Sequence, residues 1–203
     1  MKKQRVPKLA WFDPTVSDSR GGVSLNIKAA QEELCSSYAN GAIGVAVSGV
    51  VWLASGIAAL GLDARFAMAL LFFGGMAIHP LSTLIVRQIL KRPAVSADNS
   101  LEMIGLLTVP IILLGLFAGY LVSGNKPAWF FAIALMAVGA RYLTFKTIYG
   151  LSHYIVLGFA LLAIGFVGIW LAFPSGDLIA IAGGTIELIA AAILWSARPK
   201  AAV

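Results

Sequence analysis

Residues 178–196 read LIAIAGGTIELIAAAILWS, a run in which Glu187 is the only ionisable side chain. About 20 apolar residues in a helix are enough to cross the hydrocarbon core of a bilayer. An unpaired carboxylate at the centre of such a helix costs about 2.5–3.5 kcal/mol even on scales derived from helix insertion. The run therefore predicts a transmembrane helix whose acid is paired, protonated or next to water.

The rest of the chain has the composition of a multi-pass membrane protein. Of its 203 residues, 60% are hydrophobic and 12% are charged, with a mean hydropathy of +0.90, whereas soluble domains carry about 25% charged residues. The apolar runs are continuous, unlike the alternating strands of an outer-membrane barrel. We predict an all-α integral membrane protein, a bundle of six transmembrane helices preceded by a short interfacial amphipathic helix. The predicted spans are 41–61, 66–86, 103–123, 128–145, 151–173 and 178–196.

Short connections between these runs predict one domain, residues 41–197, with antiparallel neighbouring helices. Lys and Arg are enriched on cytoplasmic flanks of membrane helices. With the N-terminus inside, 13 of the 15 basic residues are cytoplasmic and only Arg65 and Lys126 lie outside. We predict a bacterial inner (plasma) membrane protein with both termini cytoplasmic. Membrane lipids, not nucleic acid, are the expected partners of its +6 net charge, and the oligomeric state is left open.

The N-terminal arm has two predicted parts. Residues 1–23 have no apolar run of their own, so we predict a basic cytoplasmic tail rather than a cleaved signal peptide. In residues 24–40, Ser24 is a candidate N-cap, and Ile27, Leu34 and Tyr38 share one helical face, which predicts an interfacial helix. Cys35 is the only cysteine and is expected to be a reduced thiol, in a position that would suit a palmitoyl group. Residues 198–203 are a second predicted cytoplasmic tail.

Three polar residues at membrane depth are predicted to face the bundle interior. Glu187 shares a helical face with small residues such as Gly183 and Gly184, which mark contacts between membrane helices. His79, before Pro80, and Arg141 also share their faces with small residues. Counted at 1.5 Å per residue, His79 lies about 10 Å and Glu187 about 14 Å from the cytoplasmic ends. We expect the three to meet in the cytoplasmic half of one bundle.

Residues 141–150, RYLTFKTIYG, carry more polar and aromatic side chains than a simple connection needs. They predict an interfacial half-helix that ends at Gly150 and borders a cavity open to the cytoplasm. Pro110 predicts a kink in the third span, with Thr108 bonding the freed backbone. The candidate ligand or ion site consists of Glu187, Arg141, His79, Tyr142, Tyr149, His153 and Lys146.

Purely structural interpretations compete with this site. Glu187 could be a structural acid that is protonated or tied to Arg141, and His79 could be a core hydrogen-bonding group. Arg141 and Lys146 also suit positive-inside anchors, and the tyrosines suit an aromatic belt. The sequence has no phosphate-binding loop, zinc-spaced Cys or His set, or HExxH motif, so no cofactor, metal or catalytic residue is assigned.

Residues 139–150, with Gly41, Trp52, Gly74 and Pro80 before them, resemble a family of bacterial multi-pass membrane proteins that is known only as a domain of unknown function. The resemblance runs from the interfacial helix to about the fifth span, and residues 139–150, GARYLTFKTIYG, are its most specific part. Thr144 stands where that family commonly has a proline, which leaves the local backbone open. The resemblance implies an architecture and no reaction. It rests on Glu33, Leu34, Ser37, Tyr38, Gly41, Gly44, Ser48, Gly49, Trp52, Gly74, Gly75, Met76, Pro80, Gly139, Ala140, Tyr142, Leu143, Phe145, Tyr149 and Gly150.

Three functions fit these residues. The first and favoured one is a small transporter or carrier, in which Glu187 exchanges a proton or binds a cation while Arg141 and His79 respond to a small-molecule or ion substrate. No inverted repeat is evident in support of it. The second is a membrane-embedded module that binds or senses a lipid headgroup or another small ligand. The third is a lipid-modifying enzyme with Glu187 and His79 as acid and base, which has the fewest candidate groups.

Overall fold

The computed structural model describes residues 27–124, 126–171 and 176–197. The predicted tails 1–23 and 198–203 and the predicted N-cap Ser24 lie outside this part of the chain. The described residues form helices and loops without a strand. The elements are α1 (Ile27–Ser37), the 3-10 turn η2 (Ala39–Gly41), α2 (Ala42–Gly61), α3 (Ala64–Leu84), the π turn η3 (Ile85–Ile89), α4 (Ser100–Leu107), α5 (Val109–Ser123), α6 (Pro127–Tyr149), α7 (His153–Trp170) and α8 (Asp177–Ser196).

Six of the helical segments are long and apolar enough to cross a membrane, as the sequence predicts. One of them, residues 100–123, consists of α4 and α5 together. The clearest difference from the predicted spans is in α6, which continues past Phe145 to Tyr149. It ends where Gly150 takes a left-handed conformation, φ 70°, which glycine adopts without steric cost. Thr144 lies inside this regular helix and donates to the carbonyl of Arg141, 2.7 Å.

The third transmembrane segment is interrupted next to Pro110, where the sequence predicts a kink. Pro110 has no backbone N–H, so the helical hydrogen bonding stops between α4 and α5. The Thr108 hydroxyl donates to the carbonyl of Gly105, 2.7 Å. At the start of α4, Asn99 accepts from the N–H of Leu101 at 3.1 Å and caps the helix.

Two helix pairs pack through the same kind of contact, a close approach of their backbones at a pair of glycines. In α2 and α8, a Cβ added to Gly184 would lie 2.7 Å from the carbonyl oxygen of Gly49, and one added to Gly49 would lie 2.9 Å from that of Gly184. In α6 and α7, the corresponding separations for Gly139 and Gly158 are 2.7 and 2.8 Å. Real Cβ atoms do not come this close to a carbonyl oxygen, so only glycine lets these backbones approach.

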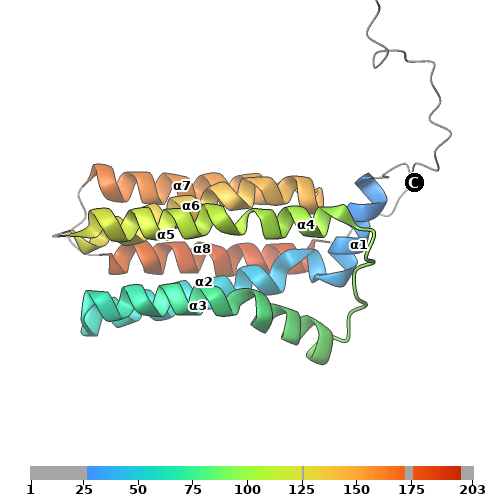
Figure 1. Cartoon of the computed structure of the whole chain (residues 1–203), viewed down its shortest axis with the longest axis horizontal. Helices are drawn as coiled ribbons and strands as arrows, with labels where there is room; N and C mark the ends of the chain where they lie inside the picture. Colours follow the sequence, from blue (N-terminus) through green and yellow to red (C-terminus); the bar gives the residue numbers. More distant parts are fainter. Residues whose placement is uncertain (1–26, 125, 172–175, 198–203) are drawn as a thin grey trace, which may run out of the picture.

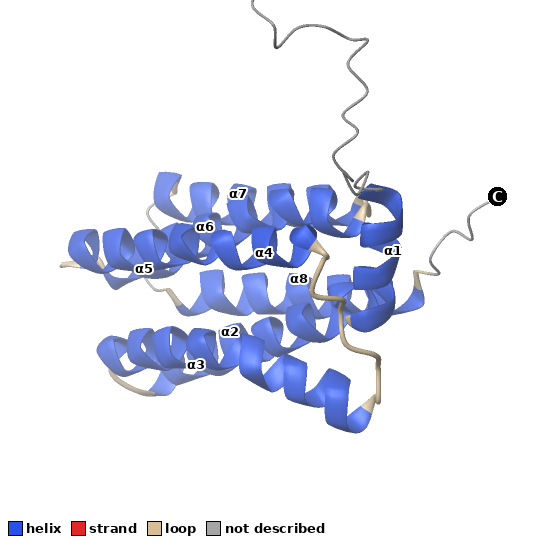
Figure 2. Cartoon of the chain, turned by 45° about the vertical axis from the view of Figure 1, so that its right-hand side comes forward, coloured by secondary structure: helices blue, strands red, loops and turns tan. Residues whose placement is uncertain are grey.

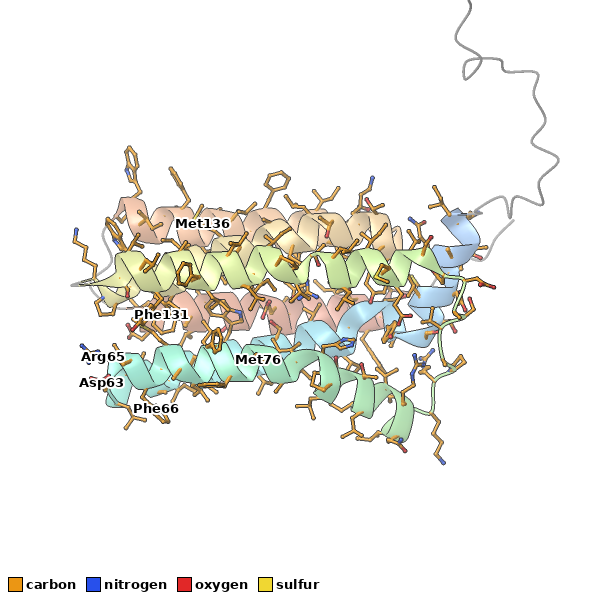
Figure 3. All side chains as sticks on the ribbon, viewed as in Figure 1. Asp63, Arg65, Phe66, Met76, Phe131 and Met136 are labelled. Atoms are coloured by element: carbon orange, nitrogen blue, oxygen red, sulfur yellow. The ribbon has the colours of Figure 1, made fainter. Side chains whose placement is uncertain are left out.

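The remaining elements lie around these two pairs (Figure 1). α5 packs on α6, and α3 packs chiefly on α2. α1 lies across one end of the bundle in Figures 1 and 2, and Asp63 and Arg65 lie at the opposite end (Figure 3). Near the α1 end, α3 diverges from the other helices in both views. Pro80 lies inside this helix, and η3 follows it, both of which are recognised causes of helix bending.

α1 is fastened to the bundle by hydrogen bonds to two segments. Gln31 donates to the carbonyl of Thr147 at 2.7 Å, and the Cys35 thiol donates to that of Tyr149 at 3.3 Å. Cys35 is 6% exposed, and burial, with the nearby Glu32 charge as the second cause, raises the pKa of its thiol to about 11. The thiol is therefore protonated at neutral pH, and it is too buried in this conformation to carry a palmitoyl group. Its reduced state stays a prediction.

The second fastening is a clamp formed by Glu33 and residues 96–99, which belong to the connection drawn in tan between α3 and α4 in Figure 2. Glu33 accepts from the N–H of Ser96 at 2.7 Å, from its hydroxyl at 3.0 Å and from the amide of Asn99 at 2.7 Å. The Ser96 N–H and then the Asn99 amide lower the pKa of this carboxyl below its ordinary value of 4.5. The clamp thus depends on an ionised Glu33.

The clamp is expected to loosen in acid. Because folding lowers the pKa of Glu33, its stabilising effect is complete above the ordinary carboxyl pKa and is lost as the pH falls through the lowered value. Hydrogen exchange of α1 and residues 96–99, corrected for intrinsic rates, should therefore show less protection at acid pH than at pH 7. Glu33→Gln should remove this pH dependence, and Glu32→Gln should keep it. Equal protection of the wild type at both pH values would contradict the assignment.

Candidate functional site

A cavity of about 820 Å³ lies between α3 on one side and α4 and α5 on the other. Ser48 and Trp52 of α2 and Val138 and Tyr142 of α6 contribute to its lining, and residues of α1 lie at one end. The volume is within the range of about 300–1,000 Å³ that is usual for ligand sites. α3 and α5 are both transmembrane segments, so the space between them is a lateral one within the bundle.

The lateral sides of the cavity differ in chemistry from its back wall and its α1 end. Large apolar side chains line it from α3 and from α4 and α5, and several are exposed, among them Phe72 at 37%, Met76 at 62%, Leu106 at 61% and Leu113 at 47%. Met76 lies partway along α3 (Figure 3). The back wall is mixed, with apolar residues such as Trp52 and Val138 beside Ser48, Arg141 and Tyr142, and more polar groups lie at the α1 end. The polar side chains of the whole lining, of which His79 and Ser82 come from α3, are Tyr38, Ser48, His79, Ser82, Asp98, Asn99, Ser100, Glu102, Arg141, Tyr142 and Tyr149.

Glu187 lies behind the cavity wall. Its side chain is 0% exposed and is absent from the cavity lining. The hydroxyls of Ser48 and Tyr142, which do line the cavity, donate to Glu187 Oε1 at 3.0 and 2.9 Å. Oε2 is buried with no hydrogen-bond partner in the described part of the chain. Glu187 therefore joins α2, α6 and α8, one hydrogen bond away from the cavity.

Arg141 lines the cavity directly and is half-buried. Its Nε donates to the Thr108 hydroxyl at the break between α4 and α5, 3.0 Å. Its guanidinium carbon lies 5.1 Å from the centre of the Phe145 ring, a cation–π distance. Within residues 27–124, 126–171 and 176–197, Nη1 and Nη2 donate no hydrogen bond, and no carboxylate forms an ion pair with this cation.

The expected meeting of Glu187, Arg141 and His79 does not occur. Glu187 is bonded to Tyr142, the residue after Arg141, so the structural alternative of a Glu187–Arg141 ion pair is wrong for this conformation. His79 lines the cavity from α3 and is exposed. The acid and base named for an enzyme are thus not in contact.

The other predicted site residues divide into two groups. Tyr142 and Tyr149 line the cavity, whereas Lys146 and His153 are exposed and outside its lining. Tyr142 is 5% exposed, and the Tyr149 ring is stacked on that of Tyr154, 5.4 Å between centres. Tyr154 is 0% exposed and donates to the carbonyl of Asn40 at 2.7 Å. Tyr142 and Tyr154 are therefore core residues and not members of an aromatic belt.

Several residues that shape the site are not among the predicted ones. Thr108 positions Arg141, and Ser48 bonds Glu187. Glu102 lines the α1 end of the cavity, where it accepts from the Tyr38 hydroxyl at 2.5 Å. The sequence signal for Thr108 is the proline that follows it at position 110, and the signal for Ser48 is the small-residue face of α2. In the described part of the chain, no three His, Cys, Asp or Glu side chains group as metal ligands would.

Fold and cavity together define the class of this protein: an all-α membrane protein with six spanning helices and a lateral cavity. A family model described as a family of unknown function, DUF7010, matches residues 27–197, and the chain belongs to this family. Neither a curated protein nor a solved structure was found to match the chain. The family implies no activity, so a function has to be argued from the cavity.

Proposed function

We propose that this protein is a membrane-embedded binding module that takes an amphipathic molecule from the bilayer into the cavity between α3 and α5. The observation that carries this proposal is the arrangement of the lining, with exposed apolar side chains such as Met76 and Leu106 along the lateral sides and polar groups such as Arg141 at the back. Acyl chains would contact the first set and a headgroup the second. α1 would lie at the cytoplasmic interface of an inner membrane, where most of the basic residues fall.

A cavity-filling substitution tests the proposal. Gly75 lines the cavity from α3, and a Cβ there would meet no atom within 4 Å. Gly75→Trp is therefore expected to fold and to lower lipid occupancy about ten-fold, or about 1.4 kcal/mol. Native mass spectrometry of protein extracted from its membrane would measure the bound lipid.

Gly61→Trp is the matched control, because Gly61 also has no atom within 4 Å of an added Cβ but lies outside the cavity lining. It should retain the wild-type lipid. Native preparations of the wild type without bound lipid, or equal occupancy in Gly75→Trp and the wild type, would refute the binding module.

Transport is the second candidate, and Glu187 favours it. A fully buried carboxyl with one unpartnered oxygen lies one hydrogen bond from the cavity, through the hydroxyls of Ser48 and Tyr142. Intramembrane acids in such places commonly carry protons. In this role, Glu187 would bind a proton as a substrate passes through the cavity. Vesicles with a pH gradient should then show substrate movement in the wild type and none in Glu187→Gln, and movement independent of the gradient would count against it.

A further inference from the structure

We propose that Arg141 binds the anionic group of the ligand, an oxyanion such as a phosphate or carboxylate, at the break between α4 and α5. This proposal rests on the proposed function, since it names the chemistry of the headgroup that the cavity would accept. It starts from an arginine that lines a membrane-depth cavity without an ionic partner in the described residues. Arg141 lies eight residues before the end of α6, or about 12 Å along the helix.

The guanidinium is held in one orientation by its neighbours. A guanidinium group has five N–H donors in a planar fork. Thr108 accepts from the Nε edge, and the Phe145 ring covers one face. The Thr108 hydroxyl is itself held, because its proton goes to the carbonyl of Gly105. The two terminal amino groups keep four N–H donors, which suits two parallel hydrogen bonds to an oxyanion.

The acids near Arg141 have other positions or partners. Glu187 is on the far side of the Tyr142 hydroxyl, and Ser48 holds the same oxygen. Glu102 lines the α1 end of the cavity and accepts from Tyr38, over whose ring Arg87 lies. Glu102 is six residues before Thr108, or about 9 Å along the helix. Asp98 belongs to the connection before α4 and is exposed. An unpaired arginine at this depth is unfavourable, and a bound oxyanion would offset that cost.

The test compares lipids that differ only in their headgroup, which is an anionic phosphate monoester in one and a zwitterionic phosphocholine in the other. The full chain in nanodiscs is offered phosphatidic acid and phosphatidylcholine with identical acyl chains, and bound lipid is counted by native mass spectrometry. The wild type is expected to prefer the anionic lipid about ten-fold, as for a charge-assisted, two-point contact. Arg141→Gln should abolish the preference, and Arg141→Lys, which keeps the charge but loses the fork, should retain part of it. Lys146→Gln is the matched control, because Lys146 is an exposed cation of the same helix outside the cavity.

The thermal midpoint separates this role from a structural one. Without ligand, Arg141→Gln should be as stable as the wild type or more so, because it removes an unpaired charge. A large loss of stability would indicate a structural arginine and overturn the proposal. Should Arg141→Gln fail to fold, Gly75→Trp, which fills the cavity and keeps Arg141, decides the question: it must lose the anionic preference, and a retained preference overturns the proposal.

The remaining outcomes distinguish the two proposals. Equal binding of both lipids by the wild type would overturn the role of Arg141 and leave the binding module standing. Binding of neither lipid would overturn the binding module. If inorganic phosphate or glycerol 3-phosphate binds with the same dependence on Arg141 while neither lipid does, the oxyanion site stands and its ligand is a free anion.

Discussion

Leucine in place of Gly184 should prevent the chain from folding. The added Cβ would lie 2.7 Å from the carbonyl oxygen of Gly49 and 2.8 Å from the backbone nitrogen of Leu53, so no side-chain rotation relieves the clash. Overpacking commonly costs about 1–3 kcal/mol even where side chains can move. We expect a loss above this range, seen as disappearance of the monodisperse peak in size-exclusion chromatography. Gly158→Leu should have the same effect, because α6 and α7 make the same contact.

Gly61→Leu and Gly75→Leu provide the controls for this prediction. Both positions have no atom within 4 Å of an added Cβ. Both variants should elute as the wild type does, with thermal midpoints close to it. A Gly184→Leu variant that behaved like these two would show that α2 and α8 do not pack through their backbones.

Replacing Glu187 by leucine should be the next most damaging change. The substitution leaves the hydroxyls of Ser48 and Tyr142 buried without their acceptor. Each unsatisfied group costs about 1–3 kcal/mol, so the two hydroxyls together are expected to cost about 2–6 kcal/mol. Glu187→Gln should be much milder, since its amide oxygen can accept both hydrogen bonds. The thermal midpoint in detergent measures both variants.

Removing the donors as well provides the control. Ser48→Ala and Tyr142→Phe, added to Glu187→Leu, replace every partner by an apolar group of similar shape, which can be nearly neutral. The triple variant should therefore regain part of the stability lost in Glu187→Leu. No recovery would mean that the cost comes from packing and not from the unsatisfied hydroxyls.

Properties set by one helix at a time could be predicted from the sequence. The apolar runs predicted six spans, Pro110 predicted the break, and the small residues beside Glu187 predicted a face turned to a neighbouring helix. Each depends only on local backbone chemistry or helical periodicity.

Properties that depend on which helices are neighbours could not be predicted in this way. Arg141 and Tyr142 are adjacent in sequence, and their side chains leave the helix about 100° apart. Periodicity alone does not say which of them faces α8. In the structure, Tyr142 donates a hydrogen bond to Glu187 of α8, and Arg141 lines the cavity. The cavity lies between α3 and α5, and Pro80 signals a bend in α3 without giving its direction or size. The burial of Tyr154 likewise depends on a distant partner, the carbonyl of Asn40, which is 114 residues away in the sequence.

The contact between Gly49 and Gly184 also sets a time scale for biosynthesis. Among the six spans, α2 is synthesised first and α8 last. The ribosome adds about 5–20 residues per second, so the 116 residues from Leu62 to Asp177 take about 6–23 s. Throughout that interval the glycine face of α2 has no partner of its own chain and is covered by lipid or by the insertion machinery. Completion of the bundle is therefore a late event that awaits the last helix, and a chain truncated before α8 leaves the glycine face of α2 without its partner.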